Sequence, residues 1–554
     1  MTVTASPDLA GTGPAGSGAA RLQLAGTAAL TRLGLRRSRI MIVGWIYAVA
    51  AFAYVSVVAT RRLTPTEASR MPFQVAAATN RVTLALYGPA GDLHTLGGLA
   101  TWKLNVYGAA AAALMSMFLV IRQTRGDEDA GRLELVEAGA VGRRATLAAG
   151  LLTALIANLG LALVAGLALA VSGLPVVPSL AYGLGMAAVG MSFAAITAVA
   201  AQLAAGARTA IGLVLSALGV AFVLRAVGDT ATGGSWPSRL SWLSPMGWAT
   251  ALRPFGPLNW WVLIIPVLFT IAVSALAFAL AGRRDLGTGL LPVRPGPPAA
   301  SPRLAGPFGL AWRLQRGPLL AWSAAIALYG LVMGALANGV SQLVGTSASV
   351  REMFVRLGGH SGLVNAYLAA IMAFMAVFAS VYAVQAVLRL RTEESGQRAE
   401  PVLAGAVGRT GWALSHLAFA IIGPAVLLMI AGLTSGLVYG AAIGDVGGQT
   451  GRMLASGLVQ LPAVWVFAGI AALLFGLVPR FTAAAWGALV LFVGLTELGS
   501  FGALSRWLPD ISPFTHVPKL PGGTFTATPL VWLVAIAVVL TVAGLAAFRR
   551  RDLA

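Results

Sequence analysis

The stretch RGDEDAGRLELVEAGAVGR, residues 125–143, is the most charged part of an otherwise apolar chain, and it occurs twice. It reappears without gaps as RTEESGQRAEPVLAGAVGR at residues 391–409, with 11 of 19 positions identical. Composition alone would give about two matches over this length in a chain so rich in Ala, Gly and Leu. The repeat is therefore real, and the constant offset between its copies provides a frame for the rest of the chain.

Each copy of the repeat predicts a short polar helix followed by a tight turn. In both copies a Glu precedes an Arg by one helical turn, Glu128 before Arg132 and Glu394 before Arg398. This is the favourable order for an ion pair along a helix. The glycines that close the motif stop such a helix. We therefore expect two polar helices, each held between long apolar segments.

The two copies differ at one position that matters for the backbone. Leu135 of the first copy is compatible with a helix that runs on toward Ala138. Its counterpart, Pro401, lacks an N–H and collides with the carbonyl one turn back. The sequence therefore predicts that the second polar helix ends near Glu400 or begins anew at Pro401. The second copy also has one charge fewer, because Leu403 replaces Glu137.

Composition defines the class of protein. Of 554 residues, 58% are hydrophobic and 10% are charged, whereas a soluble domain carries roughly 25% charged residues. The chain is therefore predicted to be an all-α polytopic membrane protein. Its net charge of +20 comes from basic residues beside apolar spans, as in membrane proteins, so no nucleic-acid partner is expected. The chain has no Cys and its four His are scattered, which leaves no metal-ligand pattern.

The apolar segments predict twelve spans in two groups of six, after a disordered tail at residues 1–19 and an interfacial amphipathic helix near residues 22–37. The first half, residues 20–286, has spans near 40–59, 102–121, 147–171, 180–204 and 209–227 and a sixth that ends near 281. A Pro-rich linker covers residues 287–317. The second half, residues 318–554, has spans near 318–340, 364–388, 413–440, 453–478, 482–500 and 529–548.

Two further short sequences recur in both halves. Arg-Arg-Asp-Leu ends the first half at residues 283–286 and recurs at residues 550–553, and Ser-Pro at 244–245 recurs at 512–513. Both recur at nearly the same offset as the charged repeat. Because six spans return a chain to its starting side, the pattern predicts a duplicated six-helix unit in parallel orientation.

The distribution of the 38 Lys and Arg residues predicts the topology. Most of them lie inside if the N-terminus, both charged repeats, the linker and the C-terminus are cytoplasmic. The Trp-rich segment Trp236–Trp261 and the segment Arg506–Lys519 are then outside. The chain is expected to be a multi-pass protein of the cell membrane.

Nothing in the sequence predicts intrinsic catalysis. A phosphate-binding P-loop needs a Lys after Gly, and the two lysines, Lys103 and Lys519, follow Trp and Pro. Ionisable residues near the ends of spans are few: Lys103, Arg225, His416 and Glu497. We interpret them as interfacial anchors, with Glu497 the strongest candidate for a function inside the membrane.

The two loops of the form E-x3-R-x-E-x-V-x-A-G-A-V-G-R, each after the second span of a six-span unit, resemble the coupling helices of ABC-2 type permeases. The duplication, the Ser-Pro segment and the Arg-Arg-Asp-Leu ends resemble more narrowly the actinobacterial exporters of polyketide antibiotics. The resemblance implies that separate ATPase subunits, expected in two copies and carrying ATP and Mg²⁺, bind these loops. The coupling residues it implies are Glu128, Arg132, Glu134, Arg143, Glu394, Arg398, Glu400 and Arg409. The alternative is that the loops only bind lipid headgroups.

The resemblance also implies a translocation path between the halves, lined by the first, second and fifth helices of each. These offer aromatic and Met side chains suited to hydrophobic or amphiphilic solutes. Helix packing or lipid contact is the alternative role for each one. The candidates are Trp45, Tyr47, Tyr54, Met115 and Phe118 in the first half, and Trp322, Tyr329, Met375, Phe378 and Tyr382 in the second.

Two other classes remain open. A twelve-helix carrier of the major facilitator type also has two parallel six-helix halves. Its loop after the second span should carry an Asp-Arg pair before Gly-Arg-Arg, but Gly139-Ala140 stands where that pair belongs, before Gly142-Arg143-Arg144. The other class is a membrane scaffold that transports nothing. A co-purifying ATPase distinguishes an ABC permease from both.

Overall fold

The computed structural model of the chain has two compact units, Met1–Pro295 and Gly296–Ala554. Their boundary falls inside the Pro-rich stretch. The residues that the structure describes are 23–71, 84–85, 87–89, 91–137, 139, 141–231, 235–285, 287–291, 298–299, 301–304, 306–344, 362–500 and 507–552. The predicted tail at residues 1–19 lies outside them.

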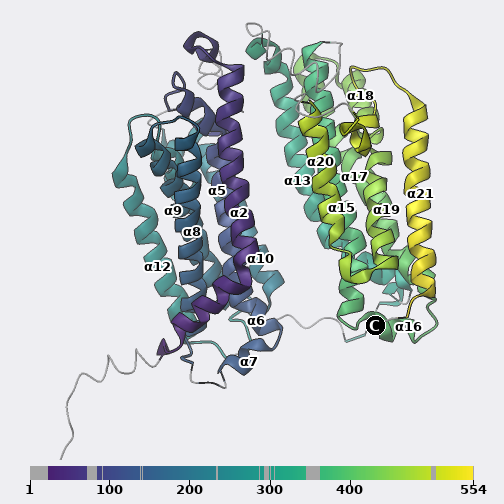
Figure 1. Ribbon diagram of the computed structural model, residues 1–554, viewed down its shortest axis with the longest axis horizontal. Coiled ribbons are helices and arrows are strands. Elements are labelled where there is room, and N and C mark those ends of the chain that lie inside the picture. Colours follow the sequence, from purple (N-terminus) through teal and green to yellow (C-terminus); the bar gives the residue numbers. More distant parts are fainter. Residues whose placement is uncertain are drawn as a thin grey trace, which may run out of the picture. The chain divides into compact units, whose positions relative to one another are not determined.

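The described residues of the first unit form six long helices (Figure 1). They are α2 (Thr27–Leu63), α5 (Leu96–Gln123), α8 (Ala145–Val171), α9 (Val176–Leu203), α10 (Ala207–Thr230) and α12 (Ile264–Ala281). Two short helices, α6 (Arg125–Asp129) and α7 (Arg132–Glu137), follow α5. The Trp-rich segment between α10 and α12 forms η1 (Trp236–Leu243), α11 (Pro245–Ala251) and η2 (Trp260–Leu263).

The second unit has the same order of long helices, with one interruption. They are α13 (Pro307–Val344), α15 (Leu363–Ser395), α17 (Arg409–Ile443), α18 (Val446–Leu458) with α19 (Leu461–Leu477), α20 (Ala484–Ser500) and α21 (Ala527–Arg550). The short helix α16 (Ala399–Leu403) follows α15, and η5 (Pro509–Ile511) and η6 (Pro513–His516) lie between α20 and α21.

Helix α9 is the centre of the first unit, where it packs against α5, α8, α10 and α12. Its apolar side chains, including Tyr182, Met186 and Phe193, are buried in one cluster with Met117 of α5. Gly183 of α9 has no room for a Cβ atom because the backbone of α8 passes directly over it. Small residues at such crossings let membrane helices approach closely and gain van der Waals contact.

The second unit is built around α15, α17 and α19. Its fourth span differs from the single helix predicted at residues 453–478, because the chain breaks between α18 and α19 at Val459 and Gln460. Pro462 explains the break, since it has no N–H for the carbonyl one turn back and its ring collides with that carbonyl. Beyond it, Gly476 of α19 meets Gly544 of α21 in a close backbone contact.

The helices account for every predicted span and confirm an all-α polytopic membrane protein. Among the described residues, eleven helices are long and apolar enough to cross a membrane, and the apolar part of α20, Ala484–Thr496, is shorter. No strand occurs in the same part of the chain.

Two expected boundaries differ in the structure. The amphipathic segment before the first span is not a separate helix, because α2 runs unbroken from Thr27. Residues 307–317, expected in the linker, form the first turns of α13.

Candidate functional site

Both charged loops break at equivalent backbone positions. In the first loop α6 ends at Asp129 and α7 begins at Arg132, with Gly131 between them at a φ of 67°. In the second loop α15 ends at Ser395, and Gln397, which occupies the place of Gly131 in the second copy of the repeat, has a φ of 55°. A left-handed residue cannot continue a right-handed helix, so each loop turns there.

The proline is therefore not the cause of the break in the second loop. Helix α16 begins at Ala399 with Arg398 as its N-cap, so Pro401 lies in the first turn. A backbone N–H in the first turn has no acceptor within the helix, so proline at this position costs no helical hydrogen bond. The expected uninterrupted helix from Glu128 toward Ala138 was also wrong, because the chain turns at Gly131.

The predicted pairs Glu128–Arg132 and Glu394–Arg398 do not form, because the turn removes the helical spacing on which they depend. Arg132 pairs instead with Asp127, its Nη2 2.9 Å from Oδ1. Arg398 pairs with Glu393, its Nε 3.3 Å from Oε2.

Glu128 instead binds the end of the last helix of its own unit. Arg284, just beyond the end of α12, meets both carboxylate oxygens, with Nη1 2.9 Å from Oε1 and Nη2 3.0 Å from Oε2. The backbone N–H of Gly287 donates to the same carboxylate at 2.7 Å. A bidentate pair of this kind fixes direction as well as distance. The Glu128 and Arg284 side chains are only 8% and 11% exposed.

Two more arginines of the repeat complete this arrangement. Arg125 lies 3.1 Å from the Glu128 carboxylate and donates to the carbonyls of Ala201 and Thr288. Arg143 donates to the carbonyl of Arg284 at 2.6 Å. Burial lowers the pKa of Arg125, and the charge of Arg284 lowers it further. The carboxylates of Glu128 and Asp129 oppose both effects and raise the pKa of Arg125.

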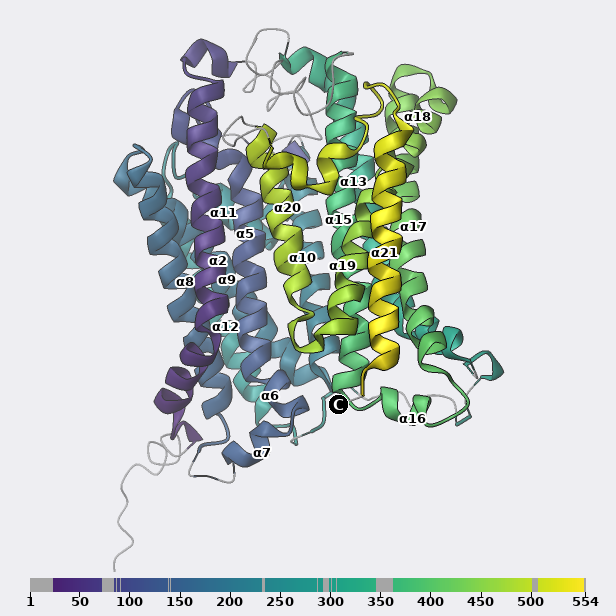
Figure 2. The same cartoon turned by 45° about the vertical axis from the view of Figure 1, so that its right-hand side comes forward.

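The second unit contains the same arrangement at the equivalent positions. Arg551, directly after α21, contacts Glu394 with Nη2 2.8 Å from Oε1 and 3.0 Å from Oε2. Arg391 lies 3.5 Å from the same carboxylate, and Arg409 donates to the carbonyl of Arg551 at 2.7 Å. The Arg551 guanidinium also lies over the ring of Phe548, 5.4 Å from its centroid. Figure 2 shows α16 and the last turn of α21 at the same end of the second unit.

We name these groups the first clasp (Arg125, Glu128, Arg143, Arg284) and the second clasp (Arg391, Glu394, Arg409, Arg551). Each joins the charged loop after the second span to the end of the sixth span of the same unit. Breaking a buried ion pair by removing one partner costs about 3–5 kcal/mol, because the remaining charge stays buried. Each clasp therefore holds its loop against the end of the sixth span.

The first loop has two further attachments. The Asp127 carboxylate accepts hydrogen bonds from both terminal nitrogens of Arg37 on α2, at 3.0 and 3.1 Å. Asp129 accepts the backbone N–H of Ala207 at the start of α10, at 2.8 Å. The first loop is thus attached to α2 and α10 as well as to the end of α12.

The eight predicted coupling residues fall into two groups. Four of them, Glu128, Arg143, Glu394 and Arg409, belong to the clasps. The other four are exposed and leave a charged face on each loop; they are Arg132, Glu134, Arg398 and Glu400. In the sequence, Arg284 and Arg551 were noted only as parts of the repeated Arg-Arg-Asp-Leu. That repeat was the signal that could have identified them as the partners of Glu128 and Glu394.

The predicted path residues do not form one lined site within either unit. Met115, Met375 and Tyr382 are packed in the cores of their own units. Trp45 stacks on Phe118 with ring centroids 6.5 Å apart, and Tyr329 meets Phe378 edge to face at 6.1 Å.

The other path candidates are more accessible. Tyr47 and Tyr54 are 73% and 45% exposed on α2. Trp322 donates to the side chain of Gln385 at 3.0 Å.

The ionisable residues predicted as interfacial anchors are placed differently. Arg225 is completely buried and pairs with Asp229 one turn later, Nη1 to Oδ2 3.2 Å, so its guanidinium is held inside the first unit. His416 is also buried, against the ring of Trp412. The side chains of Lys103 and Glu497 lie outside the described residues.

The fold defines a class of protein first: a polytopic α-helical membrane protein in which each unit ties a charged loop to its last span. Comparison with known proteins gives the family. Residues 304–549 match the family model described as "Multidrug efflux system permease Rv1217c, C-terminal domain". The chain is 41% identical over 528 residues, 95% of each chain, to "Multidrug efflux system permease protein Rv1217c" of Mycobacterium tuberculosis (strain ATCC 25618 / H37Rv). It therefore belongs to this family of multidrug efflux permeases.

Proposed function

We propose that this chain is the membrane-spanning subunit of an ATP-driven ABC-2 type exporter. The observation that carries the proposal is the pair of equivalent clasps. In each unit the loop motif uses a buried Glu and neighbouring arginines to bind the last helix. It leaves two charged side chains exposed, Arg132 and Glu134 in the first loop and Arg398 and Glu400 in the second. A loop that is rigidly tied to a spanning helix and still offers a charged face is suited to receive a force from a partner.

The proposed partner is an ATPase supplied as a separate chain in two copies, one for each loop. It would carry ATP and Mg²⁺, since the sequence of this chain has no P-loop. The charged faces around Arg132 and Glu134, and around Arg398 and Glu400, form its contacts. Movement of a docked ATPase would pass through the clasp into α12 or α21 instead of being absorbed by a loose loop.

We also propose that the two halves arose by internal duplication. The clasps support this, because Arg125, Glu128 and Arg143 occupy the same places in the first copy of the repeat as Arg391, Glu394 and Arg409 do in the second. Their partners Arg284 and Arg551 are each the second Arg of an Arg-Arg-Asp-Leu sequence. Both clasps and both termini would face the cytoplasm, with the chain in the cell membrane.

The cargo we propose is hydrophobic or amphiphilic, of the antibiotic type and including polyketides. The relative's printed name supports multidrug efflux in general. Aromatic side chains such as Tyr47 and Tyr54, exposed on α2, support the apolar character. The loops do not support the alternative of a major facilitator carrier, because the charged residues shared by both copies of the motif form the clasps.

The experiment is purification of the tagged chain from its native locus in mild detergent. We expect a P-loop ATPase to co-purify, and hydrophobic drugs to stimulate its ATP hydrolysis. A variant with Arg132→Glu and Arg398→Glu should lose the ATPase while the chain itself stays folded. Drug efflux that persists without any ATPase, and that collapses when the proton gradient is removed, would overturn the proposal in favour of a carrier.

A further inference from the structure

The first long helix of each unit begins with two exposed arginines that the clasps do not use. We name them the first arginine pair (Arg36 and Arg39, on α2) and the second arginine pair (Arg313 and Arg316, on α13). In each pair the two arginines are three residues apart, so they lie on the same side of the helix. When Trp45 is aligned with Trp322, the two pairs fall on each other. They therefore occupy equivalent positions.

The packing of the two helices confirms this alignment. Both bury the same positions against their own unit, which are Gly34, Ser38, Val49 and Ala53 on α2 and Ala311, Gln315, Ile326 and Gly330 on α13. The two helices thus turn the same side toward their units, and both arginine pairs lie outside the packed side.

No described residue neutralises the arginine pairs. Arg37, the neighbour of Arg36, is held by Asp127 at 3.0 Å. Arg36 and Arg39, in contrast, have no hydrogen-bond or ion-pair partner in the part of the chain that the structure describes, and the second pair has none there either. Like charges one turn apart on a helix repel each other. An anion shared by both guanidinium groups removes this repulsion, and arginine is well suited to hold a phosphate through parallel hydrogen bonds.

The arginine pairs lie where the apolar part of each span begins. Residues 40–60, between Arg39 and Arg61, are uncharged, and a helix of this length crosses about 30 Å, the thickness of the hydrocarbon core of a bilayer. In the second unit the next charged residue after Arg316 is Arg351. Each pair is therefore placed at the level of the lipid headgroups at one end of its span.

Exposed apolar side chains accompany the arginines. Leu33 and Ile40 are 47% and 81% exposed on α2, and Phe308 and Trp312 are 55% and 52% exposed at the start of α13. Figure 1 shows the start of α2, in purple, at an angle to the long straight part of the same helix. Basic and apolar residues exposed together are typical of helix segments that lie in the boundary between headgroups and acyl chains. This combination favours a lipid over a soluble protein as the partner.

Both arginine pairs lie at the clasp end of their own unit. The bond from Arg37 to Asp127 places the start of α2 beside the first charged loop. In the second unit Gln315, next to Arg316, donates to the carbonyl of Ala386, which precedes Glu394 by about two turns of α15. The lipid leaflet in question is therefore the one on the side of the clasps.

We propose that each arginine pair binds the phosphate of one anionic phospholipid in this leaflet. The guanidinium groups hold the phosphate, and the exposed apolar residues beside them contact the acyl chains. The first site has a further exposed arginine, Arg32, one turn before Arg36, whereas α13 has Gly309 at the equivalent position. The sites go beyond the proposed export function and need neither an ATPase nor a cargo. Their failure and that of the export proposal are therefore measured separately.

The test is native mass spectrometry of the purified full chain in detergent, titrated with dioleoylphosphatidylglycerol. We expect two tight sites, the second about fivefold weaker because it lacks the third arginine. Dioleoylphosphatidylcholine should bind at least about tenfold more weakly, since its headgroup has no net negative charge. Inorganic phosphate should not displace the lipid, because it has no acyl chains. Displacement by phosphate would show a free-anion site and overturn the proposal.

The variants remove one site at a time. Arg36→Gln with Arg39→Gln should weaken the first site by about tenfold or more, and Arg313→Gln with Arg316→Gln should do the same to the second. The matched control is Arg62→Gln with Arg452→Gln, which removes the same charge from two separate exposed positions and should keep both sites. Unchanged lipid binding in the variant with all four pair arginines replaced would overturn the proposal. Loss of the ATPase from that variant, with lipid binding unchanged, would assign the pairs to the ATPase instead.

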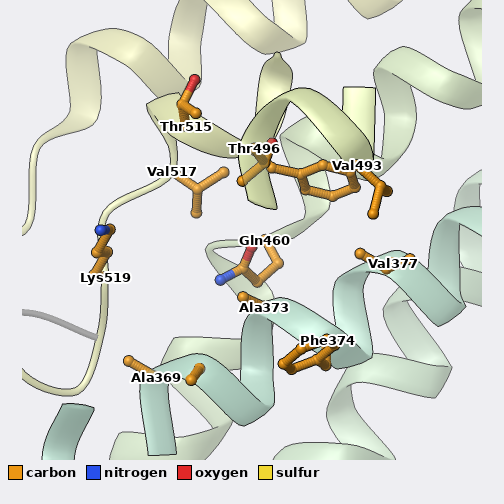
Figure 3. Close-up of a pocket in the computed structure, with 12 residues that line it drawn as sticks. Ala369, Ala373, Phe374, Val377, Gln460, Val493, Thr496, Thr515, Val517 and Lys519 are labelled. Atoms are coloured by element: carbon orange, nitrogen blue, oxygen red, sulfur yellow. The ribbon is translucent and has the colours of Figure 1, made fainter. Parts of the chain in front are cut away.

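A cavity in the second unit provides a control for binding through an acyl chain alone. It has a volume of about 160 Å³ and lies where α15, the start of α19, α20 and the segment around η6 come together (Figure 3). Ala373 on its wall is about 20 Å along α15 from Ala386, the contact of Gln315. Ala373→Phe, or Val493→Phe from α20, fills this cavity and should leave both lipid sites unchanged. Loss of a tight site in both filled variants would place the lipid in the cavity and contradict the assignment to the arginines.

Discussion

The carboxylate of Glu394 lies 2.8 Å from the guanidinium of Arg551, a residue 157 positions later in the chain. The pair joins the loop after α15 to the end of α21, and Glu128 and Arg284 do the same for α5 and α12 in the first unit. Each loop is therefore fixed to the helix that closes its own unit, while Arg132, Glu134, Arg398 and Glu400 stay at the surface.

Removing one partner of a clasp should destabilise its unit. Glu128→Gln leaves Arg284 and Arg125 without their shared charge, and Glu394→Gln does the same to Arg551. We expect a loss of about 3–5 kcal/mol in each case, because the unpaired guanidinium stays buried. Thermal unfolding of the purified chain is the measurement. The swapped pair Glu394→Arg with Arg551→Glu should recover part of the loss, and no recovery would contradict the assignment.

The exposed charges should matter for the partner and not for the fold. Glu134→Lys and Glu400→Lys change residues at the loop surface, so we expect shifts in stability within about 0.5 kcal/mol. Retention of the ATPase and drug-stimulated ATP hydrolysis should both fall. Arg452→Glu, an exposed charge of α18, is the control and should retain both. Full ATPase retention in the double loop variant would rule out these faces as the contact.

Gly131 and Gln397, the left-handed residues of the two turns, should respond in opposite ways when each is replaced by the other's residue type. Gly131 adopts its positive φ without a steric penalty, whereas Gln397 carries a penalty of about 1–2 kcal/mol. Gly131→Gln should therefore lower stability by about 1 kcal/mol, and Gln397→Gly should leave it unchanged or raise it by a similar amount. No described atom lies within 4 Å of a Cβ at Gly131, so a steric clash does not add to the backbone penalty. Thermal shifts of the same sign for both variants would contradict the turn geometry.

The absence of native Cys allows a direct test of orientation. Single cysteines in place of Arg132, Arg398 and Arg239 lie at exposed positions of the two loops and of η1. An impermeant thiol reagent on intact cells should label position 239 and spare positions 132 and 398. After permeabilisation, all three should react. Labelling of either loop position in intact cells would reverse the predicted topology.

Some of this architecture was accessible from the sequence because it depends on local properties. The length and apolarity of a segment decide whether it can span a membrane. Each predicted span therefore falls on a helix, and eleven of these helices are long and apolar enough to cross a membrane within the described residues. The duplicated motif at residues 125–143 and 391–409 marked both candidate functional loops. It also contained four of the clasp residues among its predicted coupling residues.

The partners of those residues were decided by the tertiary structure. The sequence predicted Glu128 with Arg132 from helical spacing, but the left-handed turn at Gly131 removed that spacing. Glu128 then faces Arg284 because α5 and α12 end beside each other, a relationship that no local pattern encodes. The surroundings of the break between α18 and α19 have the same origin. Pro462 marks the break in the sequence, yet the packing of α19 against α15 and α21 depends on how distant segments of the chain come together.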